Sequence, residues 1–180
     1  MIASEWVVRF APLVKPSGSV LDIACGKGRH TRYFLGRGHE VAAVDIDLSK
    51  VADLETSARL RLIETDIERD PWPFSDFRFD AVVVTNFLHR PLLDHLVQAV
   101  APEGLLIYET YARGNERWGR PSNPDFLLRA GELLEVVRGR LHVIAYEDVT
   151  VTEPRPAAVQ RICAIAPPGW QATFPRQVDG

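Results

Sequence analysis

The sequence predicts an α/β fold: a seven-stranded, mostly parallel sheet with helices on both faces and an antiparallel hairpin as its last two strands. Short apolar runs of strand length alternate with stretches whose apolar residues recur at helical spacing, which is typical of parallel strands joined by helices. The last two apolar runs, 141–147 and 160–166, are separated by only twelve residues, which include Pro154 and Pro156. Because a parallel crossover needs about a dozen residues or more and usually a helix, this pair is predicted to be antiparallel.

The elements follow from the pattern in chain order. Apolar residues at Trp6, Val7, Phe10 and Leu13 have helical spacing, and the fourth strand is apolar almost to its end, as a strand buried on both faces should be. We expect strands at 20–23, 41–45, 60–65, 81–86, 105–109, 141–147 and 160–166. We expect helices at 3–13, 29–35, 92–100 and within 127–137, where the last helix should start near 129–132. We also expect a turn at 102–104 and a tail at 167–180 that Trp170 and Phe174 hold against the domain.

Composition narrows the class of protein. A chain of 180 residues is expected to form one domain, 1–180, with its core at about 18–166. The net charge of −3 provides no general basic field, so we expect no DNA partner and no protein that holds a nucleic acid by its phosphates alone; a local basic patch stays open as an alternative. The N-terminus has no basic leader and no run approaches the ~20 apolar residues of a membrane span, so we expect a cytoplasmic protein without a membrane partner.

The cysteines and histidines do not predict a metal site. Cys25 and Cys163 have no C-x-x-C partner, and the five histidines show no ligand spacing. Two thiols in a reducing compartment are expected to be free.

The turn after the first strand predicts a cofactor site. Gly26 and Gly28 have no Cβ, so the backbone can approach a ligand closely, and the following helix start offers unpaired N–H groups. A dinucleotide fingerprint would place a glycine where Thr31 stands, and usually has no carboxylate on the strand, where Asp22 lies four residues before Gly26. The loop therefore favours a different nucleoside cofactor.

The D-x-x-x-G-x-G arrangement from Asp22 to Gly28 resembles motif I of the class I S-adenosylmethionine (SAM)-dependent methyltransferases. The sequence departs from the family pattern once, with Ala24 in place of the first glycine. This resemblance implies a Rossmann-like methyltransferase fold, SAM as the cofactor and S-adenosylhomocysteine (SAH) as the product. The runs 25–35 and 38–41 resemble the small bacterial methyltransferases of the tellurite-resistance type, which implies a small-molecule acceptor such as a thiol or a metalloid oxyanion.

The ends of the second and third strands carry the other expected cofactor residues. Asp45 follows Gly28 by 17 residues, about where a carboxylate would accept hydrogen bonds from both ribose hydroxyls. The alternative is that Asp45 caps a helix, but Ser49 is available for that before Val51. The resemblance implies that Asp66 takes the adenine amino group and that its neighbour covers the ring. The expected cofactor-binding residues are Asp22, Ala24, Cys25, Gly26, Gly28, Asp45, Ile46, Asp66, Ile67 and Asn86.

The acceptor is expected beside the ends of the fourth and fifth strands. Residues 86–90 should face the methyl donor, and they lack the Asx-Pro-Pro-aromatic sequence by which DNA amino-group methyltransferases hold their base. Residues 110–126 have no periodic pattern, and their arginines and aromatic residues predict a lid over an anionic acceptor. The alternative is a solvated surface loop. The expected acceptor-binding residues are His89, Tyr111, Arg113, Arg117 and Arg120.

No catalytic residue is assigned, because a sulfonium is already an activated leaving group and an anionic nucleophile needs no general base. His89 is the candidate base, with a purely structural role as the alternative. The helix at 3–13 either covers one edge of the cofactor site or only packs in the core. Two other functions stay open: an NAD-dependent oxidoreductase, disfavoured by Thr31, Asp22 and the final hairpin, and a non-catalytic SAM-binding or interaction domain.

Overall fold

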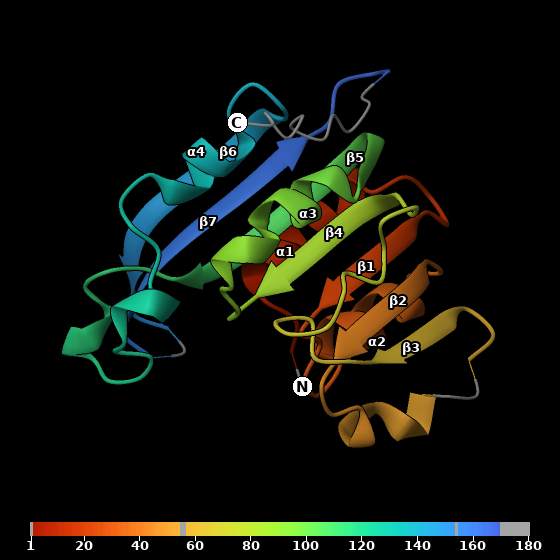
Figure 1. The fold of residues 1–180 in the computed structure, drawn as a ribbon, viewed down its shortest axis with the longest axis horizontal. Coiled ribbons are helices and arrows are strands. Elements are labelled where there is room, and N and C mark those ends of the chain that lie inside the picture. The colour runs from red at the N-terminus through yellow and green to blue at the C-terminus, as the bar shows by residue number, and fades with distance from the viewer. Residues whose placement is uncertain (1, 55–56, 154, 170–180) are drawn as a thin grey trace, which may run out of the picture.

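The computed structural model describes residues 2–54, 57–153 and 155–169, and these form one seven-stranded sheet (Figure 1). The strand order is β3-β2-β1-β4-β5-β7-β6. Strands β3, β2, β1, β4 and β5 are parallel, whereas β7 is antiparallel to both β5 and β6. This confirms the fold class. The strands are β1 (Ser19–Ile23), β2 (Glu40–Asp45), β3 (Leu60–Glu64), β4 (Phe79–Thr85), β5 (Val100–Tyr111), β6 (His142–Val151) and β7 (Ala157–Ile165).

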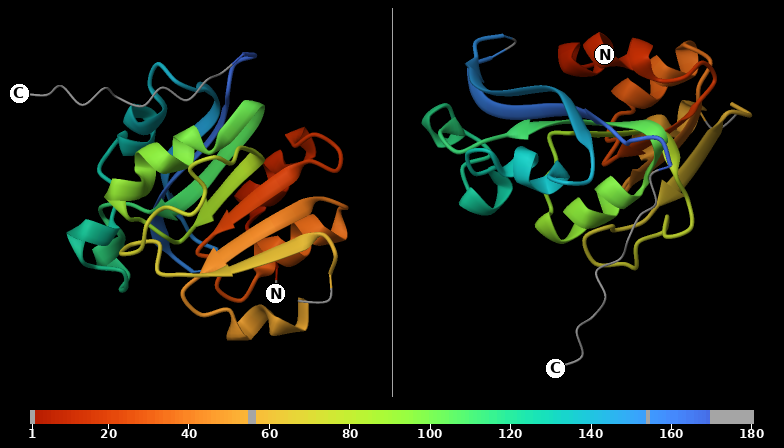
Figure 2. Two further views of the ribbon diagram at one scale, coloured as in Figure 1. Left: turned by 45° about the vertical axis from the view of Figure 1, so that its right-hand side comes forward. Right: turned by 90° about the horizontal axis from the view of Figure 1, so that it is seen from above.

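Helices cover both faces of the sheet, as Figure 2 shows in its view from above. Helices α1 and α2 pack on one face, while α3 and α4 pack on the other. The α-helices are α1 (Glu5–Phe10), α2 (Arg29–Gly36), α3 (Leu93–Gln98) and α4 (Glu132–Val137). The 3₁₀ segments are η1 (Ala11–Leu13), η2 (Ser49–Leu54), η3 (Arg90–Leu92), η4 (Asn115–Arg117) and η5 (Pro124–Phe126).

Strand β4 lies at the centre of the sheet and is apolar for the reason the sequence indicates. Its residues alternate between the two layers: Ala81 and Val83 pack with α1 and α2, whereas Val82 and Val84 pack with α3 and α4. All four are fully buried. A strand covered on both faces has no solvated side, so its sequence lacks the polar alternation of a half-exposed strand.

Strand β5 begins earlier than expected. The predicted turn at 102–104 lies inside it as a bulge, because the pairing with β4 jumps from Phe79↔Val100 to Ala81↔Leu105. Gly104 is required there, since a Cβ would lie 2.8 Å from the carbonyl oxygen of Phe79. The hairpin strands are also longer than the apolar runs suggest, so the twelve-residue connection expected between them is reduced to residues 152–156.

The segment after β2 forms the 3₁₀ helix η2, and its cap differs from the expected one. The carboxylate of Asp47 accepts a hydrogen bond from the backbone N–H of Ser49 at 3.0 Å, so Asp47 makes the capping contact that was expected of Ser49. The expected anchoring of the tail by Trp170 and Phe174 lies outside the described residues. In the parts of the chain that the structure describes, every helix is too short or too polar to cross a membrane.

Candidate active site

The carboxyl ends of the parallel strands meet at one edge of the sheet, and the glycine loop lies there against the end of β2. The backbone N–H of Gly26 donates to Oδ2 of Asp45 at 2.8 Å, and the N–H of Asp47 donates to Oδ1 of Asp45 at 3.1 Å. A carboxylate has about four acceptor positions, so Asp45 keeps capacity for ribose hydroxyls while it fixes the loop. The structure therefore brings Gly26 and Asp45 together, as the sequence suggested.

The loop backbone explains its glycines. Ala24, Gly26 and Gly28 all have left-handed φ angles, of 51°, 56° and 69°. A Cβ on Gly28 would lie 2.5 Å from Cγ1 of Val51, whereas a Cβ on Gly26 would meet no atom within 4 Å. Gly28 is thus required by packing against η2, while the space above Gly26 is open to a ligand. Ala24, the departure from the family motif, carries left-handed strain of about 1–2 kcal/mol.

Asp22 lies beneath the loop, where it joins β1 to α2. It is 1% exposed, and its Oδ2 accepts a hydrogen bond from the hydroxyl of Thr31 at 2.6 Å. Burial raises the pKa of Asp22 to about 6, although this hydrogen bond acts in the opposite direction. Thr31, which the dinucleotide pattern would replace by glycine, is therefore the partner of Asp22. A direct contact between Asp22 and the cofactor stays a prediction.

The remaining cofactor candidates lie along the same edge. Cys25 is buried, and burial raises the pKa of its thiol to about 12, so the thiol is neutral. Ile46 is 66% exposed beside Asp45, and Ile67 is buried after β3. Asp66 accepts a hydrogen bond from the N–H of Glu68 at 3.1 Å. The isoleucine side chains are suited to pack on the faces of an adenine ring, and the carboxylate of Asp66 is suited to accept from the amino group at the edge of that ring. These roles stay predictions.

At the end of β4, Asn86 is exposed and has a left-handed φ of 55°, with its N–H donating to the carbonyl of Glu109. His89, the candidate base, is half-buried, and its Nδ1 lies 3.9 Å from a carboxylate oxygen of Glu68 in the turn after β3. This contact gives His89 a structural partner and leaves the catalytic role untested.

A histidine that the sequence reasoning did not single out lies closer to the glycine loop. His30 is 2% exposed at the start of α2, and burial lowers its pKa to about 3, so the ring is neutral. Its Nε2 accepts a hydrogen bond from the N–H of Ser4 at 3.2 Å. The hydroxyl of Ser4 donates to Glu109 at 2.6 Å, and Glu109 also pairs with Arg161 at 3.0 Å. The only sequence signal for His30 was its place at the helix start.

These contacts fasten the N-terminal segment to the site edge. The indole N–H of Trp6 donates to the carbonyl of Ile162 at 3.1 Å, and Val7 and Phe10 are buried with it in the core. Helix α1 thus packs in the core, as one alternative held, while the residue before it reaches the ends of α2 and β5. Covering of a bound cofactor by this segment stays a prediction.

The segment between β5 and α4, residues 112–131, is called the long loop below. It has an internal scaffold: a bridge joins Ala112 to Leu128, and the buried amide of Asn115 donates to the carbonyl of Pro121 at 2.9 Å. At its base, the hydroxyl of Tyr111 accepts a hydrogen bond from Arg155 at 2.9 Å. The side chains of Arg113, Arg117 and Arg120 are exposed, and within the described residues they make no hydrogen bond or ion pair.

The sheet order, the glycine loop and the carboxylate that ends β2 define the fold: it is the Rossmann-like fold of the class I SAM-dependent methyltransferases. Residues 20–104 match the family model described as a methyltransferase domain. The resemblance stated from motif I is thereby confirmed.

Individual relatives support the same class. The chain is 30% identical over 172 residues to ribosomal RNA small subunit methyltransferase A of Thermosynechococcus vestitus, covering 91% of this chain and 57% of that protein. It is 35% identical over 104 residues to a malonyl-[acyl-carrier protein] O-methyltransferase of Pseudescherichia vulneris, covering 54% of this chain and 40% of that protein. The chain thus spans about half the length of the curated relatives it matches.

Solved structures share the fold at low identity. TehB from Haemophilus influenzae superposes with a TM-score of 0.73 at 18% identity, covering 91% of this chain and 62% of TehB. The 1,6-didemethyltoxoflavin-N1-methyltransferase of Burkholderia thailandensis, solved with SAH, gives 0.67 at 21% identity, covering 90% of this chain and 76% of that one. The similarity to the TehB type that the sequence suggested is therefore found in the fold.

Proposed function

We propose that this chain transfers the methyl group of SAM to a small anionic acceptor. The observation that carries the proposal is the glycine loop: Asp45 holds the N–H of Gly26, and the space where a Gly26 side chain would stand is empty. A left-handed glycine with an open face at the end of a central parallel strand is suited to close approach of a nucleoside cofactor. The proposal treats residues 1–180 as one domain and places the protein in the cytoplasm.

The residues present fit SAM and ask little further chemistry of the protein. When bound, SAM supplies a methyl group on a positively charged sulfur, and the acceptor's lone pair forms the new bond as the C–S bond electrons return to sulfur, giving SAH. The chain has to align the acceptor, and effective molarity makes such alignment worth ~7–11 kcal/mol. Since an anionic acceptor needs no deprotonation, the proposal assigns no general base.

The long loop supports an anionic acceptor. Three exposed arginines, Arg113, Arg117 and Arg120, accompany one acid, Glu116, whose carboxylate accepts a hydrogen bond from the N–H of Gly114. Arginine pairs oxyanions bidentately and stays charged. A thiolate or a metalloid oxyanion is the acceptor that the resemblance to the TehB type suggests. The malonyl-[acyl-carrier protein] O-methyltransferases among the relatives add oxygen nucleophiles of carboxylates to the candidates.

Ribosomal RNA is the acceptor class that the name of one relative suggests, and it is the second candidate. Two observations favour a small molecule over RNA. The net charge of −3 provides no general attraction for phosphates, and Asn86-Phe87-Leu88-His89 at the end of β4 is not the Asx-Pro-Pro-aromatic sequence that holds the amino group of a base in DNA methyltransferases.

Two measurements test the proposal. Calorimetric titration with SAM and with NADH separates the two cofactor classes, and tight NADH binding without SAM binding would refute the methyltransferase. SAH release is then measured over a panel of thiols, tellurite, selenite, carboxylates and ribosomal RNA. We expect turnover with a small anionic acceptor. SAM binding without SAH release over the whole panel would favour the non-catalytic SAM-binding domain.

A further inference from the structure

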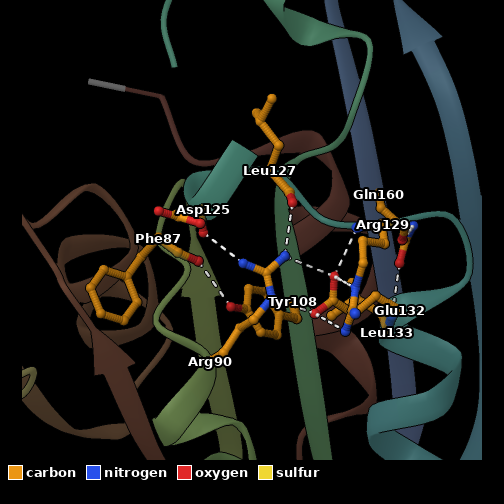
Figure 3. A network of polar contacts seen from close by, with 9 residues as sticks. All are labelled: Phe87, Arg90, Tyr108, Asp125, Leu127, Arg129, Glu132, Leu133 and Gln160. Carbon is orange, nitrogen blue, oxygen red and sulfur yellow. Dashed lines mark hydrogen bonds and ion pairs between the residues drawn. The ribbon is translucent and has the colours of Figure 1, made fainter. Parts of the chain in front are cut away.

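A polar cluster joins the turn after β4 to the C-terminal part of the long loop (Figure 3). Its centre is Arg90, the first residue of η3. Its guanidinium makes a two-pronged ion pair with Glu132, with Nε to Oε1 at 2.7 Å and Nη2 to Oε2 at 3.0 Å. It also donates to two backbone carbonyls of the loop, those of Asp125 at 2.7 Å and Leu127 at 2.9 Å. One side chain thus holds three positions of the loop and of the helix start that follows.

Glu132 is the buried, permanently charged partner of Arg90. It is 6% exposed, and it also accepts a hydrogen bond from the N–H of Arg129 at 2.7 Å. Burial acts to raise the pKa of Glu132, but the hydrogen bonds from Arg90 and Arg129 outweigh burial and lower it to about 2. The carboxylate is therefore ionised under all ordinary conditions, and the ion pair with Arg90 does not switch off near neutral pH.

Both sides of the cluster are anchored to the sheet. On the β4 side, the buried hydroxyl of Tyr108 in β5 donates to the carbonyl of Phe87 at 2.9 Å. On the loop side, the fully buried Gln160 of β7 donates to the carbonyl of Arg129 at 3.0 Å and accepts from the N–H of Leu133 at 2.8 Å. Arg90 is the member that crosses from one anchored side to the other, as Figure 3 shows.

The two segments that Arg90 joins are the ones that the proposed function needs in register. The turn at 86–89 follows the strand end nearest the glycine loop in the β1–β4 pairing, and the long loop carries Arg113, Arg117 and Arg120. A lysine at position 90 would be a single point charge with three donors, so it could not reproduce a planar fork that reaches a carboxylate and two carbonyls.

We propose that Arg90 is a positioning residue for methyl transfer: it fixes the long loop relative to the turn after β4, so that an anionic acceptor held by the loop meets the methyl donor at the required angle. This inference rests on the proposed function. The role that we assign needs no contact between Arg90 and the acceptor, because four of the five N–H donors of Arg90 are already used within the protein.

The test compares Arg90→Lys with the control Arg138→Lys. Arg138 pairs with Glu135 on the exposed side of α4, near the cluster but outside it. Initial rates are measured with the acceptor varied at saturating SAM, and SAH affinity is measured by calorimetry. We expect Arg90→Lys to lower kcat/KM for the acceptor about tenfold or more, mainly through kcat, with SAH affinity within about twofold of the parent, and we expect the control to match the parent.

A second measurement reports on the loop without activity. The N–H groups of Arg113 and Leu128, bonded across the loop base, should exchange with solvent about tenfold faster in Arg90→Lys than in the parent. Glu132→Gln provides a second variant if Arg90→Lys does not fold, because the amide keeps the shape of the side chain and loses the charge. It should show the same acceptor effect and the same exchange effect, each smaller.

The outcomes separate the two proposals. Turnover by the parent together with an unchanged kcat/KM for the acceptor in the variants overturns the positioning role alone, and so does unchanged exchange at the loop base. An equal loss of SAH affinity shows general damage and also overturns it. Absence of turnover by the parent over the whole acceptor panel overturns the proposed function and the positioning role together.

Discussion

Gly26 and Gly28 serve different purposes in the glycine loop, although both have left-handed backbones. Gly28→Ala places a methyl group 2.5 Å from Val51 Cγ1, so we expect a loss of about 2–4 kcal/mol in the free energy of unfolding, from crowding and from backbone strain. Gly26→Ala meets only open space, so it should lose about 1–2 kcal/mol and stay folded while its SAH affinity falls. Urea unfolding and calorimetry on both variants check this. Equal effects of the two substitutions would remove the distinction.

Ala24 is strained in the same loop. Its φ of 51° costs an L-residue about 1–2 kcal/mol in the folded state. A glycine avoids this strain, but it lowers the free energy of unfolding by about 0.4–1 kcal/mol because its unfolded chain is more flexible. Ala24→Gly, which restores the family motif, should therefore stabilise the protein by about 0.5–1 kcal/mol in urea unfolding. A destabilised variant would mean that the methyl group of Ala24 makes a packing contribution greater than the strain.

Asp45 is expected to act on the cofactor both directly and through the loop. Asp45→Ala removes the predicted ribose acceptor and the partner of the Gly26 N–H, so SAH binding should weaken by about 1.5–3 kcal/mol for each charged hydrogen bond lost. Asp47→Ala is the matched control, since Asp47 is an exposed carboxylate that caps Ser49 two residues away. Calorimetry in which both variants bind SAH as the parent does would refute the ribose assignment.

At the scale of elements, the sequence predicted those helices, strands and turns whose formation depends on residues near one another in the chain. The buried strands, the glycine turn and the antiparallel hairpin follow from local apolar runs and from the spacing of prolines and glycines. The bulge in β5 did not, because it depends on how β5 pairs with β4 across the sheet. The Arg90–Glu132 pair was equally hidden, because its partners are 42 positions apart and only the tertiary fold brings the two charges together.

The long loop is the element whose function is least constrained by local pattern. Arg117 and Arg120 are exposed, and their side chains make no hydrogen bond or ion pair within the described residues, so Arg117→Ala and Arg120→Ala should change stability by less than about 0.5 kcal/mol. Under the proposed function they should raise the acceptor KM or lower kcat while SAH affinity stays nearly unchanged. Arg37→Ala, an exposed arginine at the end of α2, is the control. Unchanged turnover in both loop variants would leave the segment a solvated surface loop.

Across the whole molecule, the two helical layers enclose the central strands, and one carboxylate is enclosed with them. Asp22 lies in β1, between β2 and β4 in the sheet, and its hydrogen-bonded partner is Thr31 of α2. A charge in this position opposes folding, because burial removes the carboxylate from water and the hydrogen bond from Thr31 only partly compensates. Its presence therefore needs a reason beyond stability, and the reason we propose is the predicted contact with SAM at the glycine loop above it.

The pH dependence of unfolding tests this view of Asp22. Its pKa is about 6 in the folded protein against 3.8 when exposed, so the native state binds more protons between these values, and its stability falls as pH rises from about 4 through 6. Asp22→Asn should still accept the bond from Thr31, and above pH 7 it should be more stable than the parent by up to about 3 kcal/mol. That gain should vanish near pH 4 in urea unfolding, whereas the stability that Glu132 contributes above pH 4.5 is common to both proteins and cancels. If the difference in free energy of unfolding between Asp22→Asn and the parent does not vary with pH, the pKa of Asp22 is not raised by burial in the folded protein. If the variant gains stability and loses SAH affinity, the buried charge is retained for the cofactor.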